Sequence, residues 1–293
     1  MCITITNQGY EATINALGAE LKSLKDPDGK EYIWNGSPEY WPRSSPLLFP
    51  AIGNVRNDRT IINGINYHMP KHGFARECKF TLLEKTENQV IFSLTDNAFT
   101  HKHYPFSFEL RLIYRLEGKD LEMTYQVINR DNHSMIYHIG AHPGFNCPLN
   151  KGESLSDYII EFEKDELLES YVYDLENMCF SKEKRMLHGT RGKTLKLSRE
   201  LFNNDALFFY HTNSHCVTLK NSATNKGILI EYPDFVSIAF WTPIGGNAPF
   251  LCLEPWNGSG IFEDEDDHFA NKRDIQTLKA SQQRHYRLKI SIL

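Results

Sequence analysis

The sequence lacks any apolar run that approaches the roughly 20 residues needed to span a bilayer. Its first residues, MCITITNQGYEATI, also lack the basic segment and the continuous apolar segment of a secretory signal. We therefore expect a cytoplasmic protein without a membrane partner.

An excess of basic residues is also missing. Lysine and arginine number 32 against 37 aspartate and glutamate residues, which gives a formal charge of -5. Because nucleic-acid-binding proteins need a basic surface to neutralise phosphates, nucleic acid is not an expected partner. The 41% apolar and 24% charged residues are ordinary for a globular protein with a large core.

Closely spaced cysteines are absent, and no CxxC pair occurs. Each cysteine stands beside apolar residues, so we expect reduced thiols in the core, with metal binding or redox chemistry as the weaker alternative. The six are Cys2, Cys78, Cys147, Cys179, Cys216 and Cys252.

Helical periodicity is scarce, and apolar residues instead alternate with polar ones along four segments. These are 89–94, 108–116, 121–129 and 134–142, with short turn sequences between the strands. Long helical patterns between strands, which a parallel α/β fold requires, do not occur. The sequence predicts an all-β antiparallel sandwich that forms a single domain over residues 1–293. Only 198–205, with Ser198 as a candidate N-cap, reads as a short helical turn.

The acidic segment FEDEDDH (262–268) raises the question of calcium binding. It lacks the glycine-centred spacing of an EF-hand loop. We therefore expect a solvated loop.

Two histidine pairs have the HxxxH spacing, His68 with His72 and His138 with His142. Prolines and glycines argue against helices there, and neither pair has the glutamate of an HExxH site. On a strand, residues four apart stand roughly 13 Å from each other, too far for two ligands of one zinc ion. No metal or other cofactor is expected.

Local context separates two histidines from the other ten. His142 stands where alternation ends and Pro143-Gly144 turns the chain, which predicts a ring held at a strand end facing an opening. His72 precedes Gly73, which permits close backbone approach. From this context alone, His72 and His142 are equally well explained as functional-site residues or as ordinary hydrogen-bonded histidines.

A carboxylate lies on an apolar strand face in FLCLEPWNGSG (250–260). Glu254 shares that face with Phe250 and Cys252, and such surroundings make a carboxylate a better proton acceptor. A salt-bridge partner is the alternative. Trp256 and, in another strand, Trp241 supply aromatic faces that suit the C–H face of a sugar ring.

Five motifs in this order resemble the aldose 1-epimerase (galactose mutarotase) superfamily, in particular its bacterial LacX-like branch. They are FPAIGNVRND, HGFAR, HPGF, NNDALFF and LEPWNG, and they span nearly the whole chain. The resemblance implies a large antiparallel β-supersandwich with few short helices and an open sugar cleft on one sheet face.

The resemblance also implies roles for individual residues. His142 would be the general acid and Glu254 the general base, while His72 and Asp205 hold sugar hydroxyls. Relatives often carry an arginine directly after the glycine of GNVRND, where this chain has Asn54. On a strand, Arg56 would share the face of Asn54, so both positions are candidates for substrate binding, together with Trp241.

These residues imply cofactor-free interconversion of the α and β anomers of a hexose, an aldose being the small-molecule partner. A sugar-binding module without catalysis and a hexose 6-phosphate substrate are the alternatives, the latter because of Arg43, Arg56 and Lys71. A glycoside hydrolase would use Glu254 with Asp205 as its two carboxylates.

Overall fold

A computed structural model describes the backbone of residues 1–293 and the side chains of 1–187 and 191–293. Its regular structure consists of antiparallel β-strands and six 3-10 helices of three or four residues, with no α-helix in the described chain. The expected all-β antiparallel fold with few short helices is confirmed. Across the residues described, no helix has the length and apolarity of a membrane span.

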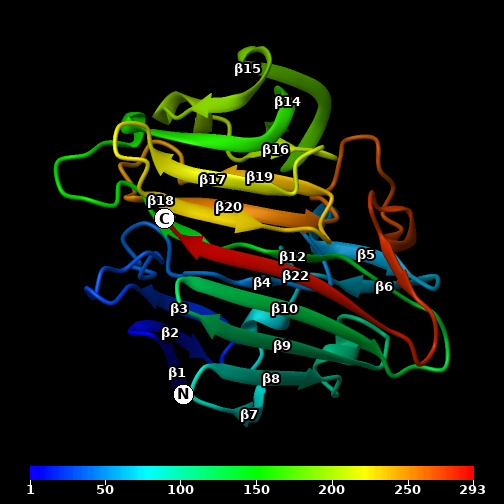
Figure 1. Cartoon of the computed structure of the whole chain (residues 1–293). Helices are drawn as coiled ribbons and strands as arrows, with labels where there is room; N and C mark the ends of the chain where they lie inside the picture. The colour runs from blue at the N-terminus through cyan, green and yellow to red at the C-terminus, as the bar shows by residue number, and fades with distance from the viewer.

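The largest sheet has nine antiparallel strands and runs through the whole height of the molecule in Figure 1. The C-terminal strand β22 lies in its middle, between β18 and β10. In order across the sheet, the strands are β15 (Cys179–Lys196), β14 (Tyr158–Asp174), β17 (Cys216–Asn221), β18 (Gly227–Glu231), β22 (Gln283–Ile292), β10 (Asp120–Asn129), β9 (Phe108–Glu117), β8 (Gln89–Thr95) and β7 (Thr81–Lys85).

A six-stranded sheet packs against part of the first one. Phe162 of the nine-stranded sheet lies between them, with its ring 5.2 Å from Phe209 and 5.9 Å from Phe240. In order, its strands are β16 (Leu207–Phe209), β19 (Ser237–Trp241), β20 (Phe250–Asn257), β12 (Ile139–Ala141) and β4 (Leu47–Leu48), with β13 (Gly144–Asn146) also paired to β20.

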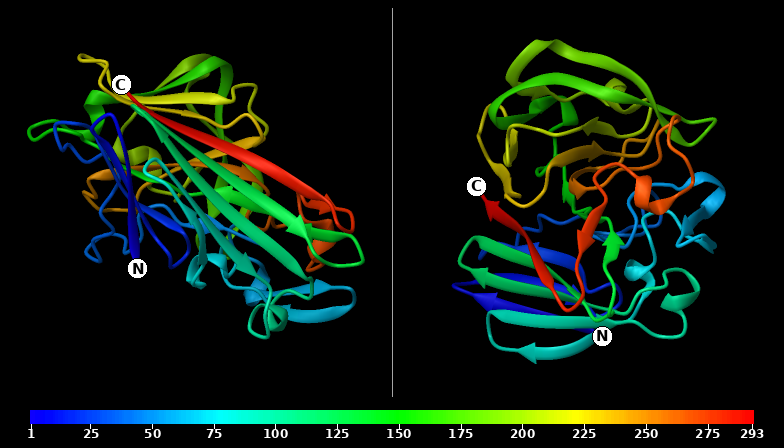
Figure 2. Two further views of the ribbon diagram at one scale, coloured as in Figure 1. Left: turned by 60° about the horizontal axis from the view of Figure 1, so that its bottom comes forward. Right: turned by 90° about the vertical axis from the view of Figure 1, so that its right-hand side faces the viewer.

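Smaller sheets and the 3-10 helices complete the structure. Figure 2 shows the N-terminal three-stranded sheet, in blue, beside β8 and β9 of the nine-stranded sheet. The remaining elements are β1 (Cys2–Asn7), β2 (Tyr10–Asn15) and β3 (Glu20–Lys25); β5 (Arg59–Ile62) with β6 (Ile65–His68); β11 (Met135–Tyr137) with β21 (Gln276–Leu278); and the helices η1 (Arg56–Asp58), η2 (Ala75–Glu77), η3 (Thr100–Lys102), η4 (Leu155–Asp157), η5 (Arg199–Phe202) and η6 (Phe269–Asn271).

The alternation of apolar and polar residues predicted strands correctly in three of the four segments. These three segments form β8, β9 and β10. The fourth prediction, one strand over 134–142, is wrong. The chain breaks at His138 into β11 and β12, which belong to different sheets. There the His138 amide donates to Pro50 O (2.7 Å) and its ring contacts Arg273 O (3.0 Å), so this residue is bound to loops.

Two further sequence expectations hold only in part. Cys2 is exposed and Cys216 half-buried, whereas the other four cysteines are buried free thiols. The acidic segment 262–268 is a mostly exposed loop, as expected, but the Glu265 side chain is only 7% exposed and pairs with the buried Lys272. The expected helical turn at 198–205 is the 3-10 helix η5, and Ser198 occupies its N-cap without a side-chain capping bond.

Candidate active site

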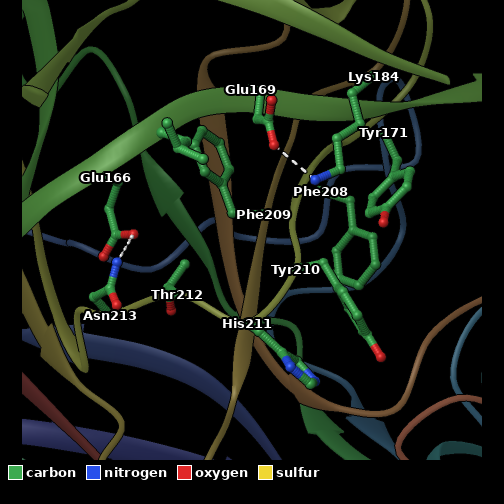
Figure 3. A pocket seen from close by; sticks show the side chains of 11 residues that line it. Glu166, Glu169, Tyr171, Lys184, Phe208, Phe209, Tyr210, His211, Thr212 and Asn213 are labelled. Atoms are coloured by element: carbon green, nitrogen blue, oxygen red, sulfur yellow. Dashed lines mark hydrogen bonds and ion pairs between the residues drawn. The ribbon is translucent and has the colours of Figure 1, made fainter. Parts of the chain in front are cut away.

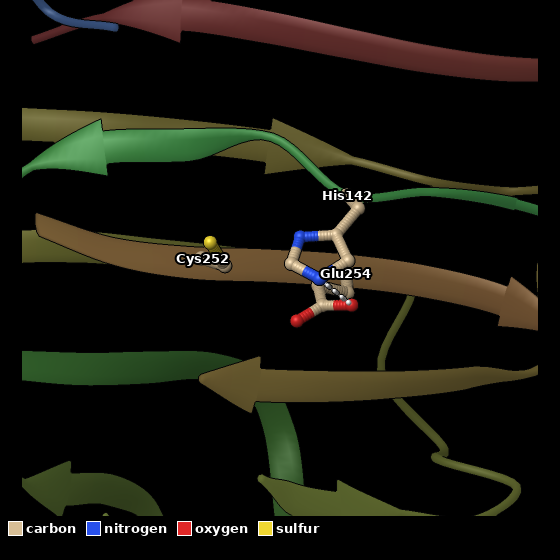
Figure 4. Close-up of side chains that lie close together, drawn as sticks. All are labelled: His142, Cys252 and Glu254. Carbon is tan, nitrogen blue, oxygen red and sulfur yellow. Dashed lines mark ion pairs between the residues drawn. The ribbon is translucent and has the colours of Figure 1, made fainter. Parts of the chain in front are cut away.

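His142 and Glu254 are brought together by strand register. Gly140 on β12 pairs with Trp256 on β20, and Gly144 on β13 pairs with Cys252 further along the same strand. The position midway between these pairs sets His142 opposite Glu254. Directly opposed residues on one face have adjacent side chains, and the His142 Nε2 to Glu254 Oε2 distance is 3.1 Å (Figure 4).

The small residues around His142 make room for aromatic rings. A Cβ atom on Gly140 would lie 2.8 Å from the Trp256 ring, and one on Gly144 would lie 3.2 Å from the Trp41 ring. Trp41 stacks on His142 with ring centres 4.8 Å apart. Gly144 therefore allows Trp41 to stack on the His142 ring. Trp241 meets the same ring edge to face, with centres 5.7 Å apart.

A cavity of about 340 Å³ opens beside the His142–Glu254 pair. This volume falls in the range of sites for small organic molecules. Its lining residues are Trp41, Pro42, Arg43, Gly53, Asn54, Lys71, His72, Arg76, His142, Tyr173, Phe180, Asp205, Ala206, Trp241, Glu254, Trp256 and Gly260.

The six-stranded sheet positions several of these groups, because neighbouring strands or the segments next to them each contribute a residue to the cavity. Asp205 precedes β16, Trp241 ends β19, and Glu254 lies in β20. His142 follows β12, and Asn54 comes after β4. Six of the seven site residues expected from sequence, His72 among them, thus line a single cavity.

Burial controls the protonation of the central pair. His142 is 7% exposed and Glu254 is 1% exposed. Burial, with a smaller contribution from nearby cationic side chains, lowers the pKa of His142 to about 3. Burial also raises the pKa of Glu254 well above its usual range, and the Asp205 carboxylate adds to this. Both shifts favour a neutral imidazole beside a protonated carboxyl group.

Several polar atoms at this pair have no hydrogen-bond partner among the described residues. They include His142 Nδ1, Glu254 Oε2 and Trp256 Nε1. The close contact between His142 and Glu254 is therefore not aligned as a direct hydrogen bond. Since buried polar atoms are normally satisfied, this cavity offers unused donors and acceptors to a ligand.

His72 is fixed in one tautomer by the loop after β4. The Gly53 amide donates to His72 Nδ1 (3.1 Å), so the ring proton resides on Nε2. Burial lowers the pKa of His72 well below 6.5, which keeps this ring neutral. Gly73 allows the arrangement, because a Cβ there would lie 2.2 Å from Phe49 O.

Arg56 does not reach the cavity. Its Nε donates to Asp267 Oδ1 (3.1 Å), its Nη2 donates to Glu265 O (2.9 Å), and its side chain is 42% exposed. The expectation that Arg56 and Asn54 share a strand face is wrong, because 56–58 form the 3-10 helix η1 with Asn57 at positive φ. The Asn54 side chain donates to Tyr173 Oη (3.1 Å) at the cavity wall.

Arg76, from the HGFAR motif, lines the cavity and has no assigned role in the sequence analysis. Its Nη2 donates to Lys71 O (2.7 Å), while its buried Nε has no hydrogen-bond partner in the described part of the chain. Burial and the neighbouring Arg43 lower the pKa of Arg76 to about 10. The motif itself was the signal, but spacing alone cannot show which of its residues points inward. Trp41 was also missed.

One group of potential metal ligands occurs among the described side chains, namely His142, Cys252 and Glu254, with donor atoms within 4.8 Å of each other. Burial raises the pKa of the Cys252 thiol well above 9, so it stays protonated. A thiol is a poor metal ligand compared with a thiolate. The group is therefore poorly suited to metal coordination.

Comparison with known proteins adds an independent observation. Residues 1–267 match the family model described as aldose 1-epimerase. The chain is 36% identical over 284 residues to protein LacX of Lactococcus lactis subsp. lactis, covering 94% of each. It superposes with TM-score 0.93 on a galactose mutarotase-like protein from Lactobacillus casei (30% identity, all of both chains) and 0.89 on a galactose mutarotase related enzyme from Lactobacillus acidophilus (29% identity, 100% and 97%).

Proposed function

Because the chain belongs to the aldose 1-epimerase family, we propose that it interconverts the α and β anomers of a hexose. The observation that carries this proposal is the 3.1 Å separation of His142 Nε2 and Glu254 Oε2 beside a cavity of about 340 Å³. An anomer interconverts by ring opening, rotation about the C1–C2 bond and closure. Two protons must move in each direction.

The buried pair supplies both proton movements. Between them, His142 and Glu254 hold one exchangeable proton. Once a bound sugar realigns the two side chains, transfer of this proton from the carboxyl to the imidazole creates an acid and a base together. The His142 imidazolium then protonates the ring oxygen while the Glu254 carboxylate accepts the proton of the anomeric hydroxyl. Closure on the other face of C1 reverses both steps. General acid–base catalysis of this kind contributes about 10²- to 10⁴-fold to the rate.

The other cavity residues hold the sugar in place. His72 Nε2–H donates to a sugar hydroxyl, and the Asp205 carboxylate accepts from another. Trp41 and Trp241, whose rings lie edge to face at 5.5 Å, provide apolar walls for the C–H face of the ring. Asn54 contributes a further polar group at the rim.

Polarimetry of freshly dissolved α-glucose and α-galactose tests the proposal. We expect the wild-type protein to accelerate the change in optical rotation, and Glu254→Gln and His142→Asn to lose most of this acceleration. Glu122→Gln, an exposed glutamate on β10, is the matched control and should keep full activity. If wild type and Glu254→Gln both relax at the buffer rate, the protein binds sugar without catalysis or does neither.

A hexose 6-phosphate is a second candidate substrate, favoured by the three cations Arg43, Lys71 and Arg76 in the cavity lining. Lys71 has no carboxylate within ion-pair distance among the described side chains. Comparing kcat/KM for glucose and glucose 6-phosphate decides between the substrates. Lys71→Met should reduce only the activity on the phosphorylated sugar if that candidate is right.

A further inference from the structure

A second cavity, of about 130 Å³, lies between the β14–β15 hairpin and β16 with its following loop (Figure 3). Among the described residues, none lines both this hairpin cavity and the cavity at His142. Its lining residues are Glu166, Leu167, Glu169, Tyr171, Lys184, Phe208, Phe209, Tyr210, His211, Thr212 and Asn213. The geometry points to a second carbohydrate-binding site here, one that takes a neutral sugar ring through its hydroxyl groups.

A buried carboxylate is the first feature that supports this site. Glu166 is 4% exposed, and its oxygens accept from the Ser214 amide (2.6 Å) and from Asn213 Nδ2 (3.2 Å). Among the described side chains, no cationic nitrogen lies within 4.0 Å of it. A carboxylate has about four acceptor positions, so Glu166 keeps capacity for hydroxyl donors from a ligand.

An ion pair and two tyrosines supply the complementary chemistry. Lys184 Nζ lies 2.6 Å from Glu169 Oε1 and 4.8 Å from the centre of the Tyr171 ring. The Tyr171 and Tyr210 rings meet edge to face, with centres 6.1 Å apart. Carboxylates, an ammonium group and aromatic rings around one small cavity provide acceptors, donors and an apolar wall, the combination that a sugar ring requires.

Other ligand classes fit less well. Two carboxylates at the cavity disfavour a phosphate or another anion. A free cation would compete with Lys184, which already neutralises Glu169. In the described part of the chain, the cavity also lacks three clustered metal ligands, since the one such group lies at His142. A neutral polyhydroxylated ring satisfies the cavity without adding charge.

Packed aromatic side chains separate the two cavities. Phe208, fully buried, has its ring 5.1 Å from Phe180 and 5.2 Å from Trp256, both of which line the cavity at His142. On β14, Tyr171 lines the hairpin cavity, and Tyr173, two residues later on the same strand, lines the other. A sugar in the hairpin cavity is thus separated from the cavity at His142 by Phe208 and the two rings that it contacts. This site goes beyond the proposed function and does not require catalysis.

Backbone amides provide separate reporters for the two cavities. The Ser214 amide donates to Glu166, and the Gly53 amide donates to His72. We would titrate the isotope-labelled full chain with methyl α-glucoside and methyl α-galactoside, which cannot open their rings, and follow both amides by NMR. The expected result is a saturable shift of the Ser214 amide with a midpoint that differs from that of Gly53.

Two variants and one control assign the Ser214 shift to the hairpin cavity. Glu166→Gln removes the carboxylate and should raise the Ser214 midpoint about tenfold. Asn213→Trp, at an exposed position, should fill the cavity and abolish the shift without changing the core. Glu161→Gln alters a β14 carboxylate outside the cavity and should leave both titrations unchanged.

Three outcomes would overturn the second site. They are a Ser214 amide that does not shift with either glycoside, a shift that Asn213→Trp leaves unchanged, and a Ser214 shift that disappears in Asp205→Asn together with the Gly53 shift. The third would mean that the signal is transmitted from the cavity at His142. If the Ser214 amide titrates as expected but polarimetry shows no catalysis, only the proposed function fails.

Discussion

Two buried acid–base pairs in this protein have opposite surroundings. Glu265 and Lys272 are 7% and 2% exposed, with Nζ 3.2 Å from Oε2, and Glu265 also accepts from the amides of Phe262 and Arg273. Glu254 and His142 are equally buried, but Glu254 Oε2 has no hydrogen-bond partner among the described residues. The first pair is satisfied within the protein, whereas the second leaves its polar atoms to a ligand.

Whether the polar atoms of a buried pair have hydrogen-bond partners distinguishes a structural role from a chemical one. The degree of burial does not, because both pairs are buried. A buried charge whose partners are all present holds loops together, and here the Lys272–Glu265 pair joins the segment before η6 to the segment after it. A buried pair with unused acceptors beside a cavity gives up stability that its partners would have provided. The mutations below test the comparison by changing one residue of each pair.

The largest effect is expected for Glu254→Gln. Glutamine matches the shape of the protonated carboxyl but cannot accept a proton, so catalysis should fall by about 10²- to 10⁴-fold. The free energy of unfolding should change by less than about 1 kcal/mol, since no satisfied hydrogen bond is lost. Polarimetry and denaturant unfolding measure the two quantities. A large loss of stability with activity retained would contradict the comparison.

Lys272→Met should show the reverse pattern. Removing Lys272 leaves the buried Glu265 carboxylate with the more distant Arg273 Nε (3.6 Å) as its cationic partner and should cost about 3 kcal/mol of stability. Activity per folded molecule should stay near that of wild type. Lys279→Met, at an exposed lysine seven residues later, is the control for the loss of a charge, and a similar destabilisation in both variants would refute the structural role of the pair.

Substitutions of two arginines test which of them lies close enough to the cavity to affect ligand binding. Arg76→Leu should raise KM about tenfold, because a buried donor beside the ligand is lost. Arg56→Leu should change KM by less than about twofold, since Arg56 pairs with Asp267 on the surface. Steady-state kinetics on the preferred sugar distinguish them, and an equal effect of both substitutions would be inconsistent with this placement.

The smallest effect is expected from pH. An isolated histidine gains a proton near pH 6.5, but burial lowers the pKa of His142 to about 3 and raises that of Glu254. Between these limits the pair holds one proton, so kcat/KM should stay nearly constant from about pH 5 up to the raised pKa of Glu254. A sigmoidal change centred near pH 6.5, after subtraction of the buffer-catalysed rate, would show that His142 titrates independently.

Alternation of apolar and polar residues predicted β8, β9 and β10, because period two is a local property of the sequence. The break at His138 was not predictable in this way, since it depends on contacts with Pro50 and Arg273 far along the chain. In the same way, an acidic stretch gives no sign that one of its glutamates is buried until the lysine that neutralises it is placed in space.

In the site, too, local sequence patterns predicted some features, whereas others depend on contacts between distant segments. Chemical type and the turn at Pro143 drew attention to His142, and an apolar strand face drew attention to Glu254. Their opposition across β12 and β20 depends on a register between segments more than 100 residues apart, which local patterns do not specify. Arg56 was misplaced because strand alternation was extended into a 3-10 turn.

The position of β22 affects how the protein assembles. This strand joins β18 on one side and β10 on the other, so it links the two halves of the nine-stranded sheet. Residues 283–292 are translated after every strand that they connect. During synthesis, therefore, both halves present unpaired strand edges until this segment leaves the ribosome, and the nascent chain depends on late pairing between distant segments to avoid aggregation.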